Sequence, residues 1–571
     1  MTKAPGGEAT TIDAGSKVPV AGEEKNPQAK ETAIAEVEPG NIVEPKPELV
    51  IGLIGPVGTD LEHLGRTLEE KLSAFRYRCA NIRVSRLIAG RCEDDFKARI
   101  AASKGGERID LLMSAGDGLR KKTKRGDALV PLIVGAIRAA RKNFQAKDGT
   151  SPRLHASNVC YVVNSLKHPD EVKMLRELYG DGFVLISAFD SEEARSSRLR
   201  DIIAKSHLST ETESYRKEAE ELIRIDAKRP GERFGQNVRE TFPLGDFFLR
   251  VSEGYEASLD RFLDLFFGSP YLTPKRSEFL MFEASGNALR SADLSRQIGA
   301  VIVDRHGETV SSGCNEVPKA GGGAYWPDEE GPADNRDHRM GKDFNAVKKF
   351  DIVREFMEFL GDNGILVPPT GGGIDEAVKE VLTGRYKELF KDLRVSNLIE
   401  FGRVVHAEMS ALMRAAQRGI AVGGGEIYST TFPCHMCARH IISAGIVRVV
   451  YIEPYPKSMT AELYPEIVSI DTAPTVGSMS GDGVATRVSF EPFEGVAPPI
   501  FPAIFRMSKR KDRQGYTVDW SRAAAVPKTF KLAESDLQIE QAFALDVDDL
   551  PLISLGEVLG EKVDVVEPRR D

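Results

Sequence analysis

The sequence predicts an α/β protein with at least two domains, the first of which is built on a mainly parallel sheet. From residue 49 onward, short apolar runs alternate with amphipathic helical segments, which is the order that places parallel strands beside crossover helices. A strand, a glycine-rich turn and a helix follow one another at 49–72, as at the start of nucleotide-binding α/β domains. The chain has 571 residues, which is too long for a single hydrophobic core.

Residues 1–47 are rich in Ala, Glu, Lys, Pro and Gly and contain no aromatic residue, so we expect a disordered tail. The first domain is predicted at 48–245. Its strands are expected at 49–54, 109–113, 159–163 and 183–186, with helices at 129–140 and 169–179 between them. The charged stretch 193–245 is expected to be helical, and 246–273 is interpreted as a connector.

The first strand leads into a turn that resembles a phosphate-binding loop. Such loops end in Gly-Lys-Ser/Thr, because the lysine reaches the terminal phosphates. Here Thr59 and Asp60 follow Gly58, and the lysine is missing. Backbone N–H groups could still hold a phosphate, so the candidate nucleotide-binding residues are Gly52, Gly55, Gly58 and Thr59. A regulatory nucleotide sensor and a purely structural turn are both consistent with this pattern, and phosphoryl transfer is not expected.

The second domain is predicted at 274–505, with strands at 299–303, 426–430 and 448–452. The long stretch 318–400 is interpreted as an insertion that contains a helix at 346–360. Insertions of this length usually carry function or regulation. Residues 506–571 are expected to form a C-terminal extension that ends in an acidic tail.

The net charge of −9 gives no general basic signature for nucleic-acid binding. A basic run at 120–125 could contact RNA or phosphates, although a solvated charge run explains it equally simply. Six cysteines are few for this length, which favours a reducing compartment over a disulfide framework. No signal peptide and no membrane span are predicted, so the expected location is the cytoplasm and no membrane partner is expected.

One motif pair carries the chemistry. His406 and Glu408 are two residues apart, and Cys434 and Cys437 follow directly after Pro433. Each pair should sit at the start of a helix, where free N–H groups and the helix dipole stabilise thiolates. One imidazole and two thiolates supply three zinc ligands and leave one of the four positions of the ion open for water.

Glu408 is close to this site but is not expected to be a ligand. It is the candidate catalytic residue, which takes a proton from water and passes it to the ring nitrogen and the leaving amine. The expected reaction is hydrolysis at C4 of a cytosine ring with loss of ammonia. A structural zinc site or a redox-active cysteine pair would explain the two cysteines, but neither requires a carboxylate beside the histidine.

At these residues the chain resembles the zinc-dependent cytidine and deoxycytidylate deaminases. The resemblance runs through about 274–460 and includes 295–303 and the turn 313–318, Gly-Cys-Asn-Glu-Val-Pro. In that family the turn asparagine contacts the sugar, which makes Asn315 the candidate here; an asparagine selected for turn conformation is the alternative. The family also implies that Arg290 or Arg296 reaches the substrate phosphate, and that Ala407 contacts the substrate. The resemblance implies one Zn²⁺ per subunit and an α/β/α domain.

The whole layout, over about 48–505, resembles the bacterial anti-phage dCTP deaminases, which join a degenerate P-loop nucleotide-kinase-like domain to a deoxycytidylate deaminase domain. That resemblance implies deamination of dCTP or dCMP to the uracil form, which drains a DNA precursor during infection. It also implies an inhibitory small RNA and a homo-oligomer. Two other interpretations stay open, namely a deaminase that edits tRNA or single-stranded DNA, and a nucleotide- or RNA-binding regulatory sensor.

Overall fold

The computed structural model describes residues 46–560 except for 150–155, 230–231, 233, 253, 329–333, 367–372, 392, 394, 396–397, 399–400, 454–457, 472–486, 529–539, 541–542 and 544–549. All described residues fall within one compact unit. The predicted tail at 1–47 lies outside the described residues except for its last two positions. One of these, Lys46, is buried and donates its ammonium to the carbonyl of Phe75.

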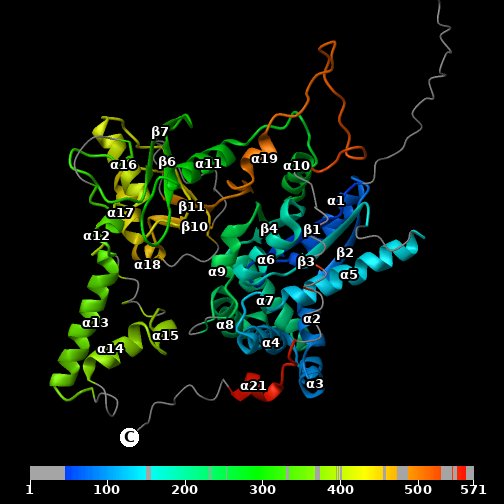
Figure 1. Ribbon diagram of the computed structural model, residues 1–571, viewed down its shortest axis with the longest axis horizontal. Helices are drawn as coiled ribbons and strands as arrows, with labels where there is room; N and C mark the ends of the chain where they lie inside the picture. Colours follow the sequence, from blue (N-terminus) through cyan, green and yellow to red (C-terminus); the bar gives the residue numbers. More distant parts are fainter. Residues whose placement is uncertain are drawn as a thin grey trace, which may run out of the picture. The chain divides into compact units, whose positions relative to one another are not determined.

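The first part of the chain alternates strands and helices (Figure 1). Its elements are β1 (Leu49–Ile54), α1 (Leu61–Ser73), β2 (Arg78–Arg83), α2 (Val84–Gly90), α3 (Asp94–Ala102), α4 (Gly105–Thr123), α5 (Val130–Lys147), β3 (Val159–Asn164), α6 (Pro169–Tyr179), β4 (Phe183–Phe189), α7 (Glu192–Ser206), α8 (Arg216–Ala227), α9 (Val238–Thr241), β5 (Phe247–Arg250) and α10 (Glu256–Phe266).

Among the described residues, six strands form the first sheet in the order β12-β5-β4-β1-β3-β2. The five strands from β1 to β5 are parallel, which confirms the predicted mainly parallel sheet. β12 (Gly495–Val496) comes from far along the chain and pairs antiparallel with β5. β1 is buried on both faces, as is usual for a central parallel strand. Its alternate residues pack against α1 and α10 on one face and against α5 and α6 on the other.

Two predicted boundaries of the first domain need correction. Residues 109–113 were expected to form a strand, but they lie inside helix α4, where Leu111, Ala115 and Leu119 recur every four residues and are buried. A five-residue apolar run fits either structure, and here the helical spacing of the following residues decides the outcome. The segment 246–273 is more than a connector, because it supplies β5 to the first sheet and α10 to one of its helical layers.

The second part of the chain contains the remaining elements. They are α11 (Arg276–Ala288), β6 (Gly299–Val303), β7 (Thr309–Cys314), α12 (Asp337–Met340), α13 (Phe344–Asp362), α14 (Ile374–Leu382), α15 (Lys387–Lys391), α16 (Ala407–Gln417), β8 (Glu426–Ser429), α17 (His435–Ser443), β9 (Arg448–Tyr451), α18 (Thr460–Leu463), β10 (Val468–Ile470), β11 (Val488–Pro492), β12, α19 (Phe501–Phe505) and α21 (Leu555–Gly560). The helix predicted at 346–360 is confirmed as α13.

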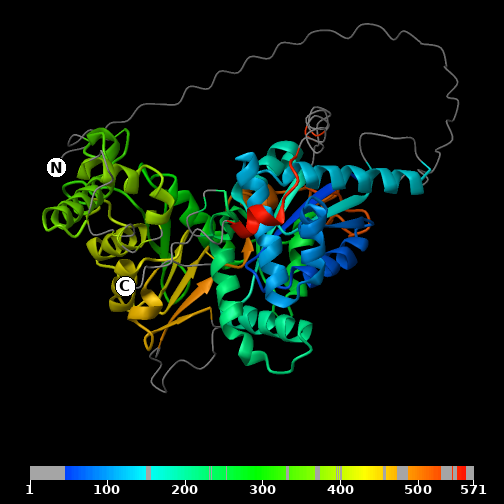
Figure 2. The same cartoon turned by 90° about the horizontal axis from the view of Figure 1, so that it is seen from below.

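The second sheet has the order β10-β11-β9-β8-β6-β7 among the described residues. The strands from β10 to β8 are parallel, and β6 pairs antiparallel with both β8 and β7 (Figure 2, green to orange strands). Ala300 and Ile302 of β6 pack against α16 and α17, whereas Val301 and Val303 pack against α11. The layers are therefore α/β/α, as expected for this domain.

The described residues of the C-terminal extension return to the first sheet. Trp520 donates its indole N–H to the carbonyl of Phe267 at the end of α10. Further along, Ile553 is buried and forms a parallel bridge with Cys92 between α2 and α3. The extension thus covers helices of the first domain. None of the helices in the described ranges has the length and apolarity needed to cross a membrane.

Candidate metal centre and active site

Three side chains predicted as metal ligands converge in the α/β/α domain built on the second sheet. The ligand atoms of His406, Cys434 and Cys437 all lie within 4.8 Å of one another. Nδ1 of His406 is 3.3 Å from Sγ of Cys434 and 3.4 Å from Sγ of Cys437. No other group of at least three such residues meets this spacing in the described part of the chain.

Two helix starts bring these ligands together. His406 directly precedes α16, and Cys434 directly precedes α17 and accepts a hydrogen bond from the backbone N–H of Cys437 at 3.4 Å. On the side of α16, Val405 and Glu316 exchange both backbone hydrogen bonds, at 3.0 and 3.1 Å. This bridge fixes the chain immediately before His406 against the turn that follows β7.

The thiols and the imidazole form one hydrogen-bonded group. Hydrogen bonds from Cys437 and from His406 lower the pKa of the Cys434 thiol to about 4. The pKa of Cys437 is raised, because its thiol donates to the Cys434 thiolate. The same contact with Cys434 raises the pKa of His406. An imidazole nitrogen and two sulfurs at this spacing match the soft donor set that zinc prefers, and zinc would displace the remaining protons.

Glu408 lies in the first turn of α16 and is 3% exposed. Its Oε1 accepts a hydrogen bond from the hydroxyl of Ser429 at 3.2 Å. Burial raises the pKa of Glu408, and the negative charge of Cys434 adds to this shift. A carboxylate whose pKa is raised by burial holds a proton more readily than a free carboxylate, and such a shift is typical of a general acid–base.

Two of the predicted substrate residues belong to the segments that flank this group: Ala407 follows His406, and Asn315 precedes Glu316, which bridges to Val405. Ala407 is fully buried. Its backbone N–H, at the first residue of α16, has no partner within the helix and is the group of this residue that is suited to a ligand. Asn315 is 5% exposed. Its side chain accepts from the backbone N–H of Ile298 at 2.7 Å and donates to the carbonyl of Arg296 at 2.8 Å. In this structure Asn315 therefore holds two strand ends together.

The two candidate arginines differ in their surroundings. Arg296 is exposed, and its charge acts on the half-buried carboxylate of Glu453. Arg290 stacks on the ring of Trp326 at 3.9 Å and lines a cavity of about 450 Å³ together with Ser311, Arg414 and Arg418. None of the zinc-ligand candidates lines that cavity, so of the two arginines Arg296 is the better candidate for substrate contact.

The candidate residues of the glycine turn have local structural roles. A Cβ at Gly52 would come within 2.8 Å of the Phe183 ring, and one at Gly55 within 2.7 Å of the Ala188 carbonyl. Gly58 has a φ of +89°, a backbone conformation that L side chains rarely adopt. Close packing and turn geometry thus explain these glycines, and their role in nucleotide binding, together with that of Thr59, stays a prediction.

The basic run at 120–125 does not form one exposed cationic surface. Arg120 is buried and pairs with Glu171, whereas Lys121 pairs with Glu232 and Lys122 with Glu557. These pairs neutralise much of the charge that made the run a candidate for RNA contact.

Two residues near the centre were not predicted from the sequence. Ser429 ends β8, is fully buried and contacts Glu408. Glu453 accepts from the hydroxyl of Thr431 at 3.3 Å, just before Phe432 and Pro433 lead into the first cysteine. The signal for both is their position at or just after the end of a buried strand that neighbours the motif, where polar residues commonly serve a site.

Comparisons with known proteins point to the same segment. The model of the cytidine and deoxycytidylate deaminase zinc-binding region matches residues 274–453. ComE operon protein 2 of Bacillus subtilis (strain 168) is 45% identical over 53 residues, which are 9% of this chain and 28% of that protein. Deoxycytidylate deaminase of Enterobacteria phage T2 is 41% identical over 54 residues, 10% of this chain and 29% of that protein.

A solved structure of dCMP deaminase from the cyanophage S-TIM5, in complex with dCMP and dUMP, aligns with 39% of this chain and 100% of its own at 16% identity and a TM-score of 0.21. The chain spans less than a third of the length of the curated relatives described above. Residues 274–453 thus match the zinc-binding region of cytidine and deoxycytidylate deaminases, and that region contains all four residues of the candidate centre.

Proposed function

We propose that the chain is a zinc-dependent hydrolase that converts deoxycytidine nucleotides, dCMP or dCTP, to deoxyuridine nucleotides and ammonia. The observation that carries the proposal is the buried carboxylate of Glu408 beside the group formed by His406, Cys434 and Cys437. A structural zinc site has no use for such a carboxylate, whereas hydrolytic deamination requires a group that moves protons at the metal.

The chain's own residues divide the chemistry between them. The imidazole and the two thiolates would hold a zinc ion, which would lower the pKa of a bound water toward neutrality. Glu408 takes one proton from the attacking water and delivers it to N3 of the cytosine ring, and it then carries the second proton, from the hydroxyl formed at C4, to the leaving amine. One water adds at C4 and one ammonia leaves. Ser429 keeps the Glu408 carboxylate oriented through its hydroxyl, 3.2 Å away.

The substrate assignment depends on the turn after β7 and on the relatives. A deoxycytidylate deaminase is among the proteins that match this segment. The backbone N–H of Ala407 is the candidate donor to the pyrimidine ring, and Arg296 is the candidate partner of the 5′-phosphate. Asn315 shapes the sugar side of the site by holding Ile298 and Arg296 in place. We place the reaction in the cytoplasm, with one zinc ion per subunit of a homo-oligomer.

The proposed biological role is depletion of dCTP during phage infection, under the control of an inhibitory small RNA. It rests on the resemblance of the whole layout to anti-phage dCTP deaminases. A plating assay tests it, because cells that express the wild-type chain should reduce phage titre. Cells that express Glu408→Gln at equal protein level should not, and equal protection by both proteins would reject a role for deamination in defence.

The decisive experiment for the reaction is product analysis with the zinc-loaded full chain. Cytidine, dCMP, dCTP and CTP, together with a single-stranded DNA and a tRNA, are incubated separately and the uracil products are quantified. The proposal predicts turnover of dCMP or dCTP and little turnover of either polymer. Turnover of polymers alone would favour an editing enzyme, and no turnover of any substrate would favour a regulatory sensor.

A further inference from the structure

A second cavity lies in the first domain, away from the candidate zinc centre. It has a volume of about 550 Å³ and opens beside the turn after β1. Residues just after the ends of β1 and β3 line it, together with parts of α2, α4 and α7. Ligands of open α/β sheets bind at the carboxyl ends of strands, and 300–1,000 Å³ is roughly the range of small-molecule sites. None of the candidate residues of the zinc centre lines this cavity.

The turn beside the cavity uses its own polar groups internally. The N–H of Val57 donates to the carboxylate of Asp226 at 2.7 Å, and the N–H of Thr59 donates to the carbonyl of Pro56 at 3.0 Å. The carbonyl of Gly55 accepts from the Lys167 ammonium at 3.0 Å. Asp226 is fully buried and also accepts from Lys167 at 2.8 Å. This carboxylate therefore binds the N–H and the ammonium that a phosphate group would need.

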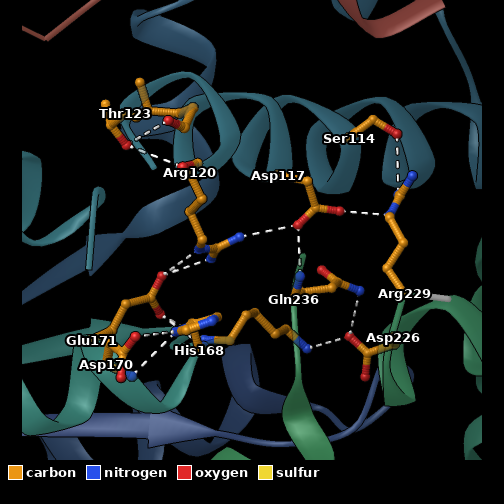
Figure 3. A network of polar contacts seen from close by, with 12 residues as sticks. Ser114, Asp117, Arg120, Thr123, His168, Asp170, Glu171, Asp226, Arg229 and Gln236 are labelled. Carbon is orange, nitrogen blue, oxygen red and sulfur yellow. Dashed lines mark hydrogen bonds and ion pairs between the residues drawn. The ribbon is translucent and has the colours of Figure 1, made fainter. Parts of the chain in front are cut away.

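The cations around the cavity are also neutralised. Figure 3 shows one polar network that joins Arg120, Asp117, Glu171, Arg229 and Asp226. Arg120 pairs with Glu171 at 2.6 Å and with Asp117 at 3.1 Å, and Arg229 pairs with Asp117 at 2.6 Å.

Lys167 pairs with Asp226, so that within this network Arg120, Arg229 and Lys167 each have a carboxylate partner among Asp117, Glu171 and Asp226. At the mouth of the cavity, Arg198 pairs with Asp190 at 3.2 Å and donates to the carbonyl of Gly58. A multiply charged ligand would have to break buried ion pairs, which is costly.

Two carboxylates also line the cavity: Asp60, which caps α1 by accepting from the backbone N–H of His63, and Glu62, which pairs with Arg83. The other groups left for a ligand are uncharged. The hydroxyl oxygen of Thr59 is buried at the cavity and makes no hydrogen bond to any described residue. The amide of Asn164 and the hydroxyl of Ser165 also line the wall. The apolar part of the lining comes from α2 and α4, through Ile88, Ile109, Leu112 and Met113. Apolar side chains and a few neutral polar groups in one cavity suit a heteroaromatic ring attached to a hydroxylated sugar.

We propose that this cavity binds an uncharged nucleoside, with its base against α2 and α4 and its sugar hydroxyls near Thr59. The site goes beyond the proposed deamination and does not depend on it. The proposal also gives the glycine turn a different role from phosphate binding. The turn shapes the cavity, and the carboxylate of Asp226 occupies the N–H group and the ammonium that would otherwise bind a phosphate.

The test is equilibrium binding by calorimetry with the zinc-loaded full chain carrying Glu408→Gln, so that no ligand is consumed. Thymidine and adenosine are compared with their 5′-monophosphates and 5′-triphosphates. At least one nucleoside should bind, and its phosphorylated forms should bind at least about tenfold more weakly, because phosphate meets only paired cations. Tighter binding of the phosphorylated forms, or no binding of any nucleoside, would overturn the proposal.

Two variants test whether the nucleoside binds in this cavity. Ile202 lines the cavity from α7 and is 46% exposed, whereas Leu208 lies just after α7, is 92% exposed and does not line it. Ile202→Trp should weaken the nucleoside at least about tenfold by filling the mouth, and Leu208→Trp should leave its affinity unchanged. Equal affinities in both variants would move the site elsewhere. Thr59→Val, which keeps the shape, should weaken binding by about tenfold through the lost hydroxyl.

Discussion

Ser429 shows how a residue outside the motif can govern the candidate catalytic carboxylate. It is fully buried at the end of β8, and its hydroxyl is the donor that the structure places 3.2 Å from Glu408. A hydrogen bond to the charged form of a carboxylate favours that form, while burial favours the neutral form. Burial raises the pKa of Glu408 despite this hydroxyl, so Ser429 opposes the dominant effect.

Replacement of Ser429 by Ala should therefore lower kcat by about fivefold, which corresponds to the loss of one hydrogen bond. The acid limb of the pH–rate profile should move to higher pH, because Glu408 loses a donor that favours its ionised form. KM for dCMP should stay unchanged. Ser443→Ala, at an exposed position at the end of α17, is the control. A lower kcat without any shift of the acid limb would contradict this role.

The charge of a second residue, Asp334, is expected to contribute to the stability of the fold. Its carboxylate accepts from Arg336 at 2.8 and 3.0 Å and from Arg339 at 3.3 Å. Hydrogen bonds from Arg336 hold the pKa of Asp334 well below its usual value. A carboxylate with a lowered pKa in the folded state stabilises that state above its unfolded pKa of about 3.9, and the contribution disappears as the pH falls through the folded pKa.

Denaturant unfolding of the wild type and of Asp334→Asn between pH 3 and pH 7 measures this contribution. The difference in free energy of unfolding should be largest and constant above about pH 5, and it should shrink as the pH falls below about 4. The same difference at pH 3 and pH 7 would show that the ion pairs of Asp334 contribute nothing to stability.

At the scale of elements, the contact between β7 and α16 sets the position of the metal centre. A Cβ at Gly313 would lie 2.4 Å from the carbonyl oxygen of Ala407 and 2.5 Å from the N–H nitrogen of Ala411. The helix that begins after His406 and carries Glu408 therefore lies directly on the backbone of β7. A glycine in an otherwise ordinary strand was the sequence signal of this close approach.

Gly313→Ala should push α16 away from the sheet and lower the free energy of unfolding by about 1–3 kcal/mol. Zinc affinity should fall with it, because His406 moves with the helix. Gly286→Ala on α11 is the matched control, since no atom lies within 4 Å of its Cβ position. That change should be neutral or stabilise by up to about 1 kcal/mol. Equal effects of the two substitutions on zinc affinity would contradict the packing argument.

Elements with local signals were predictable, and those fixed by distant contacts were not. Residues 49–54, 169–179 and 299–303 have the predicted bounds, because turn and capping residues flank them. The run at 109–113 is helical because it belongs to a longer pattern of buried residues along α4 that extends to Leu119. The five residues by themselves do not show this pattern. The zinc ligands and Glu408 follow from spacing alone, whereas Ser429 reaches the site only through the pairing of β8 with β6.

At the scale of the whole molecule, Glu278 on α11 joins the two sheets. It is fully buried and accepts from Arg261 on α10 at 2.8 and 2.9 Å and from the backbone N–H of Val496 at 3.0 Å. Val496 belongs to β12, which completes the first sheet from the C-terminal side. One carboxylate thus joins the predicted connector, through Arg261, to two distant segments of the domain predicted at 274–505.

Glu278→Gln removes the charge opposite Arg261 and leaves that cation poorly compensated. The free energy of unfolding should fall by about 3 kcal/mol, as for other broken buried ion pairs. Urea unfolding measures it. Glu283→Gln on the same helix is the control, because Glu283 is only partly buried and accepts from the hydroxyl of Thr309. A change in Glu278→Gln no larger than in the control would show that the junction does not stabilise the fold.

The central claim is that Glu408, beside a three-ligand zinc site, carries proton transfer in the deamination of deoxycytidine nucleotides. The most direct test is the rate of uracil formation from dCMP and dCTP by the zinc-loaded chain, with zinc content measured on the same samples. Glu408→Gln should bind zinc like the wild type and lose kcat by about 10²–10⁴-fold, while Glu462→Gln, exposed on α18, should keep it. Full activity of Glu408→Gln at equal zinc content would contradict the account.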